Sequence, residues 1–252
     1  GVMALFELRG LKKAFGRNVV LDGLDLDIFA GEVVTLIGES GSGKSIVLKA
    51  MMGLIELDGG TIKFDGEDVT GQSEAEWIRT RQRIGMLFQE SALFDSLDVY
   101  ENVGYALREQ TSMSEEEIQQ RVGETLSLVA LPGIEHMAPS DLSGGMRKRV
   151  ALARAVAVRP EIVFYDEPAE GLDPINVTRV NRLLLGLKDS LNVTSVVVTH
   201  NLKAAFAISD RLALIHDGVV AATGAPETFL DSQDAVVREF IGERMRKVLR
   251  AS

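Results

Sequence analysis

The chain has 252 residues, of which 46% are hydrophobic and 25% charged, enough apolar sequence to bury a sizeable core. It contains no cysteine, which excludes disulfide bonds and thiolate metal sites, and its net charge of −10 argues against nucleic acid as the main partner. No apolar run reaches the roughly 18 residues that a membrane-spanning helix needs, and no signal peptide is visible. Any work at a membrane is therefore expected to require docking on something else.

The first part of the chain alternates short apolar runs with turn residues. Short β segments are predicted at 5–8, 19–21 and 33–37. The run at 33–37 is typical of a buried parallel strand, and it leads through glycines into an expected helix at 44–54. After the run 61–64, Asp65-Gly66 predicts a hairpin turn.

The loop between the strand at 33–37 and the following helix matches the phosphate-binding pattern G-x-x-x-x-G-K-[ST]. Its residues are Gly38, Glu39, Ser40, Gly41, Ser42, Gly43, Lys44 and Ser45. Glycines let backbone N–H groups curl around phosphate oxygens, and the start of the helix adds positive partial charge. Lys44 is expected to reach the β and γ phosphates of ATP, and Ser45 to ligate Mg²⁺. A chance glycine-rich turn is the weaker interpretation, because the pattern lies between a strand and a helix.

From 91 to 157 the sequence pattern is helical. Ser114 and Glu117 have the spacing of a capping box at a helix start. The expected helix then presents one apolar face, formed by Ile118, Val122, Leu126 and Val129. This segment contrasts with the strand-rich sequence on either side of it.

A second buried strand, at 162–165, runs directly into Asp166 and Glu167. Two acids after a strand more often form a solvated turn, but together with the phosphate-binding loop they favour a metal site. Asp166 is then expected to hold Mg²⁺, directly or through water, and Glu167 to orient and deprotonate the attacking water. A helix and another buried strand, at 195–199, follow, and this alternation indicates an α/β fold with a mostly parallel sheet.

The run Leu142-Ser143-Gly144-Gly145-Met146, followed by Arg147-Lys148-Arg149, closely resembles the LSGGQ-type signature of ABC ATPases. Ser143 also predicts a helix N-cap, and a helix N-terminus is itself an anion site. Four further landmarks follow the order of that family over residues 4–225. They are Phe15 for the aromatic that stacks on adenine, Gln89 for the Q-loop, Gly171-Leu172-Asp173-Pro174 for the D-loop and Thr199-His200 for the switch histidine.

The resemblance implies a P-loop NTPase with a RecA-like core, an N-terminal antiparallel β subdomain and an inserted α-helical subdomain. The expected boundaries are 4–90 with 158–225 for the core and β subdomain, 91–157 for the helical subdomain and 226–252 for a helical tail. It also implies a homodimer in which Ser143, Gly144 and Gly145 of one subunit cap the γ phosphate held by the other, with Asp173 contacting the opposite subunit. Gln89 and His200 would join Glu167 in ATP hydrolysis, and Gln89 would also sense Mg²⁺.

Several segments narrow the resemblance to the MlaF/Mkl group, the ATPases of MCE-type transporters that move phospholipids or other lipids. They are Met146 with its basic triplet and the runs 87–97, 99–103 and 235–242. The implied partners are an MlaE-like permease, a periplasmic MCE protein and, as a further candidate, a small STAS-domain subunit. Residues 91–107 would line the groove for the permease's coupling helix. The expected location is cytoplasmic, on the inner face of the inner membrane through the permease.

Three other functions compete with lipid transport. An ABC importer of polar amino acids or other small solutes is the nearest alternative. A soluble ABC ATPase acting on DNA or ribosomes calls for a long coiled-coil insertion or a tandem second ATPase domain, and the sequence contains neither. A catalytically silent ATP-binding module calls for a damaged Lys44, Glu167 or His200, and all three are intact.

The last residues form a basic amphipathic segment, 235–250. Its apolar residues at helical spacing are Val237, Ile241, Met245 and Val248, and its basic residues are Arg238, Arg244, Arg246, Lys247 and Arg250. The apolar face could pack on the chain's own core, or the segment could attach to anionic lipid. We favour a third possibility, contact with the partner subunit, because the rest of the chain is acidic.

Overall fold

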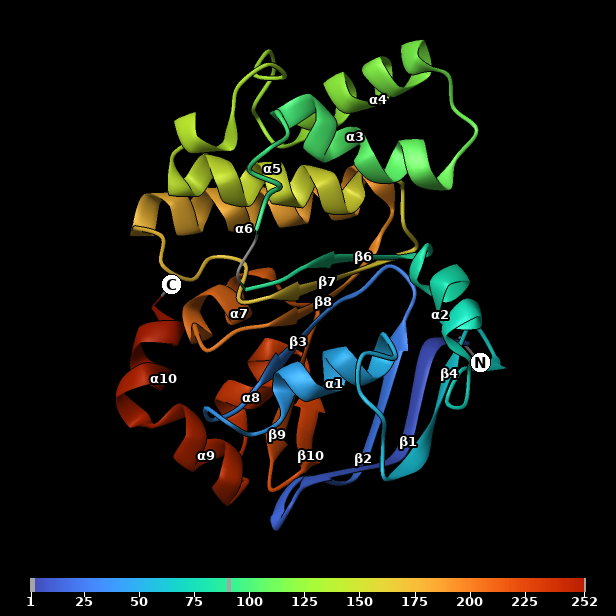
Figure 1. The fold of residues 1–252 in the computed structure, drawn as a ribbon. Coiled ribbons are helices and arrows are strands. Elements are labelled where there is room, and N and C mark those ends of the chain that lie inside the picture. Colours follow the sequence, from blue (N-terminus) through green and yellow to red (C-terminus); the bar gives the residue numbers. More distant parts are fainter. Residues whose placement is uncertain (1–2, 90–91, 252) are drawn as a thin grey trace. The chain divides into compact units, whose positions relative to one another are not determined.

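The computed structural model describes residues 3–89 and 92–251. Its residues separate into two compact units, one formed by the chain up to Thr80 together with the part from Thr194 onward, and the other by Arg81–Val193 (Figure 1). Each unit has its own strands and helices. The segment 91–157, expected to be helical, lies inside the second unit.

The first unit contains an antiparallel sheet with the strand order β2-β1-β4-β5. Its strands are β1 (Ala4–Phe15), β2 (Asn18–Phe29), β4 (Gly59–Phe64) and β5 (Glu67–Asp68). The first two are longer than the predicted short segments, because they pair along almost their whole length. Phe6 of β1 and Phe64 of β4 are paired across the two strands, and their rings stack with centroids 4.4 Å apart. The predicted turn at Asp65-Gly66 is confirmed, with φ of 52° and 81°, and joins β4 to β5.

The same unit contains a mainly parallel group of strands in the order β10-β9-β3-β8. They are β3 (Val33–Ile37), β8 (Thr194–Val198), β9 (Arg211–His216) and β10 (Val219–Gly224). β3 pairs in parallel with both β8 and β9, while β10 is antiparallel to β9. Every residue of β3 and β8 is buried, which confirms the prediction of buried parallel strands.

Three helices of this unit lie close to the strands: α1 (Lys44–Met51), α2 (Glu74–Arg81) and α7 (Leu202–Ile208). α1 ends earlier than the predicted 54, and the chain turns at Gly53 with φ of 65°. A Cβ at Gly53 would lie 2.1 Å from the Trp77 ring, so the turn can approach the tryptophan only without a side chain.

The second unit is a parallel strand pair with four α-helices and a short 3₁₀ turn. Its elements are β6 (Ile84–Leu87), α3 (Val99–Gln110), α4 (Glu115–Leu128), η1 (Pro139–Asp141), α5 (Gly144–Val156), β7 (Ile162–Asp166) and α6 (Pro174–Leu191). The predicted capping box is confirmed: Ser114 accepts from Glu117 N, and the Glu117 side chain accepts from Ser114 N. Within the described residues, no helix is both long and apolar enough to span a membrane.

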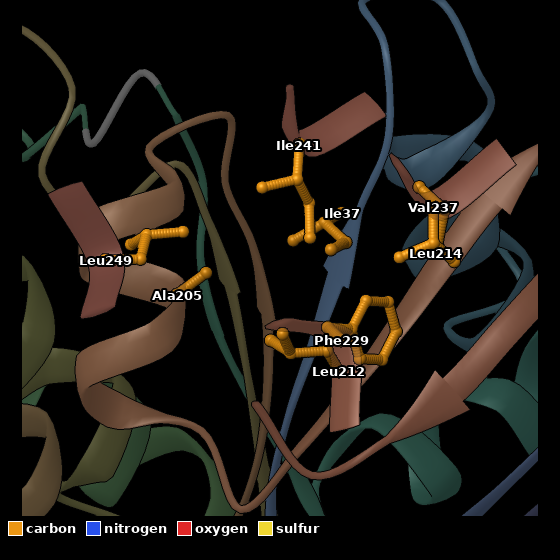
Figure 2. Packing of buried hydrophobic residues seen from close by; sticks show 8 residues of the cluster. All are labelled: Ile37, Ala205, Leu212, Leu214, Phe229, Val237, Ile241 and Leu249. Atoms are coloured by element: carbon orange, nitrogen blue, oxygen red, sulfur yellow. The ribbon is translucent and has the colours of Figure 1, made fainter. Parts of the chain in front are cut away.

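The C-terminal segment forms α8 (Pro226–Asp231), α9 (Ala235–Ile241) and α10 (Glu243–Arg250) in the first unit. Val237 and Ile241 are buried in a cluster with residues of β3, β9 and α8, among them Ile37, Leu214 and Phe229 (Figure 2). The expectation that this apolar face reaches a partner subunit is therefore wrong. The face covers the chain's own strands, which is the first of the three alternatives.

The basic residues of this segment are also used internally. Arg246 donates to the carbonyl of Leu230 at 2.6 Å, and Arg250 donates to the same carbonyl at 3.2 Å and to Asp231 at 2.9 Å. These cations lie at the C-terminal end of α8, where the helix dipole favours positive charge. Gly242, with φ of 68°, separates α9 from α10, so the segment is not one continuous helix. Truncation after Asp234 would therefore uncover the first unit's core rather than leave it intact.

We predict that Ile241→Ala lowers the free energy of unfolding by about 2–4 kcal/mol, because it leaves a cavity in the cluster of Figure 2. Urea unfolding followed by circular dichroism measures the change. Ile175→Ala is the matched control, since this isoleucine is 74% exposed and its truncation should change the stability by less than about 0.5 kcal/mol. Equal effects of the two substitutions would contradict the packing role of the tail.

Candidate nucleotide-binding and hydrolysis site

The loop 38–45 leaves the end of β3 and continues into α1. Lys44 is 8% exposed, and its ammonium donates to the carbonyl oxygens of Gly38 and Glu39, both at 2.8 Å. Ser42 Oγ lies 3.4 Å from the same nitrogen. The loop therefore curls around a lysine ammonium, as a phosphate-binding loop requires.

The backbone of this loop has room for glycine and for nothing larger at its tightest points. Gly43 has φ of 99°, and an added Cβ would lie 2.9 Å from Val20 Cγ1. A Cβ at Gly38 would lie 2.6 Å from the carbonyl oxygen of Ile215. No side chain caps α1, so the positive end of its dipole is available to an anion that binds in the loop. These features fit a nucleotide phosphate.

Two further predicted residues lie in the same unit. His200 follows β8, whose Val198 is level with Leu36 of β3, so the histidine and the phosphate-binding loop leave the parallel strands at the same edge. Phe15, at the end of β1, is 49% exposed, with the Lys13 ammonium 5.2 Å from its ring centre. Phe15 is thus not a core residue, which is compatible with stacking on a base.

The acids of the second unit occupy the equivalent position on β7. Asp166 is the last residue of the strand and Glu167 follows it with φ of 50°; both are buried. A positive φ is uncommon at a residue other than glycine, and at an active site it can hold a side chain in a fixed position. β6 pairs in parallel with β7, with Leu87 level with Tyr165, so Gln89 leaves the pair at the edge where the acids lie.

Gln89 is held by two residues that the sequence did not single out. Its side-chain Nε2 donates to the carboxylate of Glu170, and its backbone carbonyl accepts from the Lys148 ammonium at 2.7 Å. Burial lowers the pKa of Lys148, and the carboxylates of Glu170, Asp166 and Glu167 partly oppose that shift. The basic triplet after Met146 contains Lys148, but in the sequence this triplet indicated only the family resemblance and not a contact with Gln89.

The predicted signature residues form the start of α5. Ser143 caps the helix by accepting from Met146 N at 3.2 Å, as predicted, and both Ser143 and Gly144 are exposed. Asp173 caps α6 in the same way, accepting from the backbone of Ile175 and Asn176 at 3.0 and 3.1 Å. A Cβ at Gly145 would lie 3.0 Å from Asn176 Oδ1, so the two helix starts are close neighbours.

The remaining cations of α5 brace the loops around it. Arg147 donates to the carbonyl of Pro139 at 3.0 Å, and Arg149 donates to those of Val129 and Ala130 at 3.3 and 3.2 Å. Further along, Arg154 donates to the carbonyl of Ala92 at 3.1 Å. Each basic residue of the triplet thus donates hydrogen bonds to the carbonyl groups of a different backbone segment of the same unit.

The donor set is also compatible with a magnesium ion. In the ranges 3–89 and 92–251 no group of three or more His, Cys, Asp or Glu side chains could by itself hold a metal. Mg²⁺ does not need such a cage, because it commonly takes one or two protein oxygens and completes its shell with water and phosphate oxygens. Ser45, Asp166 and Gln89 remain the candidate ligands.

The structure groups the candidate residues by unit. The phosphate-binding loop, Phe15 and His200 belong to the first unit, and Gln89, Asp166, Glu167, Asp173 and the signature residues to the second. Within each unit they follow the carboxyl ends of parallel strands or occupy helix starts, apart from Phe15, which ends an antiparallel strand. Ligands of α/β folds bind in such places.

Comparison with known proteins places these features in a family. Residues 21–170 match the family model described as "ABC transporter". The chain is 40% identical over 238 residues to a probable ribonucleotide transport ATP-binding protein, mkl, of Mycobacterium leprae, covering 94% of this chain and 69% of that protein. It is 39% identical over 237 residues to the intermembrane phospholipid transport system ATP-binding protein MlaF of Haemophilus influenzae, covering 94% and 90%.

A solved structure supports the fold. The ATP-binding cassette MJ0796, described as a dimer in a post-hydrolysis state bound to ADP and Pi, aligns with a TM-score of 0.79 and 31% identity. The alignment covers 88% of this chain and 98% of the cassette. The expected fold class, an α/β P-loop ATPase with a β subdomain and inserted helices, is confirmed.

We predict that Gly43→Ala weakens ATP binding by about tenfold or more, because a left-handed residue other than glycine costs about 1–3 kcal/mol and the new Cβ crowds Val20. Equilibrium titration with a fluorescent ATP analogue measures the effect. Gly123→Ala is the control: Gly123 lies within α4 and nothing is within 4 Å of an added Cβ, so ATP affinity should stay unchanged. If both substitutions leave the affinity unchanged, the loop does not bind phosphate.

Proposed function

Because this chain belongs to the ABC transporter family as an ATP-binding subunit, we propose that it powers the movement of phospholipids or other lipids across a bacterial envelope. The protein is an ATPase that uses ATP with Mg²⁺. The observation that carries the lipid assignment is the similarity to MlaF, which extends over 94% of this chain and 90% of that protein. The MlaF name refers to intermembrane phospholipid transport.

The candidate residues divide the chemistry of hydrolysis among them. The backbone of loop 38–45 and the Lys44 ammonium bind the β and γ phosphates. Ser45, Asp166 and Gln89 supply oxygens for Mg²⁺, which when bound offsets the phosphate charge. Glu167 accepts the proton of the attacking water. The Glu167 carboxylate is buried next to Asp166 and is therefore kept away from bulk solvent. His200 contacts the γ phosphate, and Phe15 stacks on the adenine.

We place the signature residues in trans, so that the working form is a homodimer. Ser143 and Gly144 are exposed at the start of the 13-residue helix α5, and an exposed helix start binds anions. In a dimer this helix start caps the γ phosphate bound to the other copy, and Asp173 lies at the contact. The MJ0796 cassette, which is similar to this chain, is itself described as dimeric.

An exposed aromatic pair supports docking of a permease on the second unit. Phe94 and Tyr105 are each 47% exposed, and their ring centroids lie 5.4 Å apart. The Arg154 guanidinium lies 5.8 Å from the Phe94 ring centre, which keeps this ring oriented. Both aromatics belong to the segment 91–107, which is expected to line the groove that receives the permease's coupling helix. Ser91 itself lies outside the described residues. Docking there would place the protein on the cytoplasmic face of the inner membrane.

The nearest alternative is import of a small polar solute. It is favoured by the name of the mkl relative, which refers to ribonucleotide transport. The two cargoes call for different partners. Lipid transport calls for an MlaE-like permease with an MCE protein, and in some systems a STAS-domain subunit. Solute import calls for a permease with a water-filled path and a solute-binding protein.

Reconstitution tests the choice between these cargoes. The chain is co-purified with the membrane proteins encoded beside it, and the complex is placed in vesicles with ATP inside or outside. ATP-dependent movement of fluorescent phospholipid between the complex and acceptor vesicles supports the proposal. Uptake of a nucleotide or amino acid without lipid movement would instead establish the alternative.

For the chemistry, we predict that Glu167→Gln lowers ATP turnover by about 10²–10⁴-fold, the usual contribution of a general base. ATP affinity should remain, because the phosphate-binding loop is unchanged. Phosphate release in single- and multiple-turnover assays provides the measurement. A variant that keeps more than about a tenth of the wild-type rate would remove Glu167 from this role.

For the dimer, we predict that mixing Lys44→Ala with Ser143→Ala subunits restores hydrolysis that neither variant shows alone. If the signature acts in trans, the mixed dimer has one site with both an intact Lys44 and an intact Ser143. Turnover is measured on heterodimers isolated with two affinity tags. Isolated heterodimers without activity would rule out the trans arrangement.

A further inference from the structure

The Gln89 residue is held at both its main chain and its side chain. The Lys148 ammonium on α5 donates to the Gln89 carbonyl at 2.7 Å, and the Gln89 side-chain amide donates to Glu170, three residues after Glu167. All three residues belong to the second unit, so the cluster is formed within one compact body. None of the catalytic roles described above uses Lys148 or Glu170.

The chemistry of Glu170 fixes which way the Gln89 amide points. The Gln89 amide donates to the Glu170 carboxylate through Nε2, so the NH₂ side of the amide faces Glu170. The carbonyl oxygen Oε1, the atom of the amide that can ligate a cation, then points away from Glu170. A neutral or apolar residue at 170 would not discriminate between the two amide orientations.

Lys148 fixes the other end of the residue. Its side chain is partly buried, and its ammonium has exchanged water for a loop carbonyl in the neighbourhood of three carboxylates. Because Lys148 lies five positions after Ser143 on α5, the helix that starts with the signature also holds the backbone of Gln89. Arg154, on the same helix, holds the carbonyl of Ala92 on the far side of the loop.

We propose that Lys148 and Glu170 are positioning residues that hold Gln89 with its side-chain oxygen available to Mg²⁺. The inference rests on the proposed function of Gln89 as a magnesium ligand, and it adds two residues that act through Gln89 rather than on the nucleotide. Loss of either residue leaves the phosphate-binding loop unchanged and lowers the benefit that Mg²⁺ brings to ATP binding.

Equilibrium binding of ATP to the full chain, with Mg²⁺ and with EDTA, tests the proposal. The quantity compared is the dissociation constant with EDTA divided by the dissociation constant with Mg²⁺. A large ratio means that Mg²⁺ strengthens ATP binding. We expect Lys148→Met and Glu170→Ala each to reduce this ratio by about tenfold, because each loses a hydrogen bond that involves a charged group. Lys148→Arg can still donate to the Gln89 carbonyl and should keep most of the wild-type ratio.

Arg147→Met is the matched control. It removes a cation from the next position of α5, but Arg147 holds Pro139 rather than Gln89, so the ratio should stay within about twofold of wild type. Circular dichroism establishes that each variant is folded, and Lys148→Arg with Glu170→Gln provides milder replacements if the first pair does not fold. For these two milder variants, the ratio is expected to be near the wild-type value in Lys148→Arg and lower in Glu170→Gln.

The outcomes separate this inference from the proposed function. Wild-type ratios in Lys148→Met and Glu170→Ala, alongside a reduced ratio in Gln89→Ala, overturn the positioning role and leave the role of Gln89 intact. Equal weakening of ATP binding with and without Mg²⁺ also overturns it, because a general structural role has that effect. An unchanged ratio in Gln89→Ala means that the assignment of Gln89 as a magnesium ligand is itself wrong.

Discussion

Parallel pairing of fully buried strands is the constraint on which the candidate site depends. β3 lies between β8 and β9 and exposes none of its five residues, so no side chain along its length is open to a ligand. Its one polar side chain, Thr35, is buried with its hydroxyl 2.6 Å from Ser209 Oγ. Polar chemistry is therefore placed directly after the strand ends, at Gly38 and His200. The β6–β7 pair repeats this arrangement with Gln89 and Asp166. Because parallel strands end at the same edge, residues far apart in the sequence are brought to one edge within each unit.

The same constraint explains why the chain changes direction so sharply at these points. Left-handed backbone conformations allow a sharp change of direction, and the site uses them at a helix start and after a strand. Gly43, at the start of α1, adopts one without a steric penalty, whereas Glu167, directly after β7, adopts one at φ of 50° despite its Cβ. Glu167 follows Asp166 directly and both are buried, so two carboxylates lie one after the other at the end of β7. A glycine there would relieve the strain but would remove the proposed base.

The extent of what could be predicted from sequence follows from the range of each interaction. The strands at 33–37 and 162–165, the capping box at Ser114 and the glycine-rich loop between a strand and a helix depend mainly on local sequence, and all appear where predicted. The binding of phosphate by that loop stays a prediction. The length of β1 and β2 was underestimated because their outer residues are polar and are held by cross-strand pairing. Lys148 and Glu170 could not be assigned, because neither a hydrogen bond to a loop carbonyl nor one between two side chains far apart in the sequence produces a periodic pattern. For the tail, helical spacing indicated that Val237 and Ile241 would be buried, but spacing cannot identify the covering surface.

The position of the tail changes the argument about how two copies associate. Its apolar face and several of its basic residues are used within the first unit, so they are not available to attract an acidic partner. Two copies with a net charge of −10 each repel one another, and bound ATP adds negative charge to both. In the proposed homodimer, positive features that meet the nucleotide would offset this repulsion. Lys44, a magnesium ion taken up with ATP and the exposed start of α5 are the candidates. In this account ATP is itself a part of the dimer contact, and salt, which screens the repulsion between the copies, favours rather than opposes their approach.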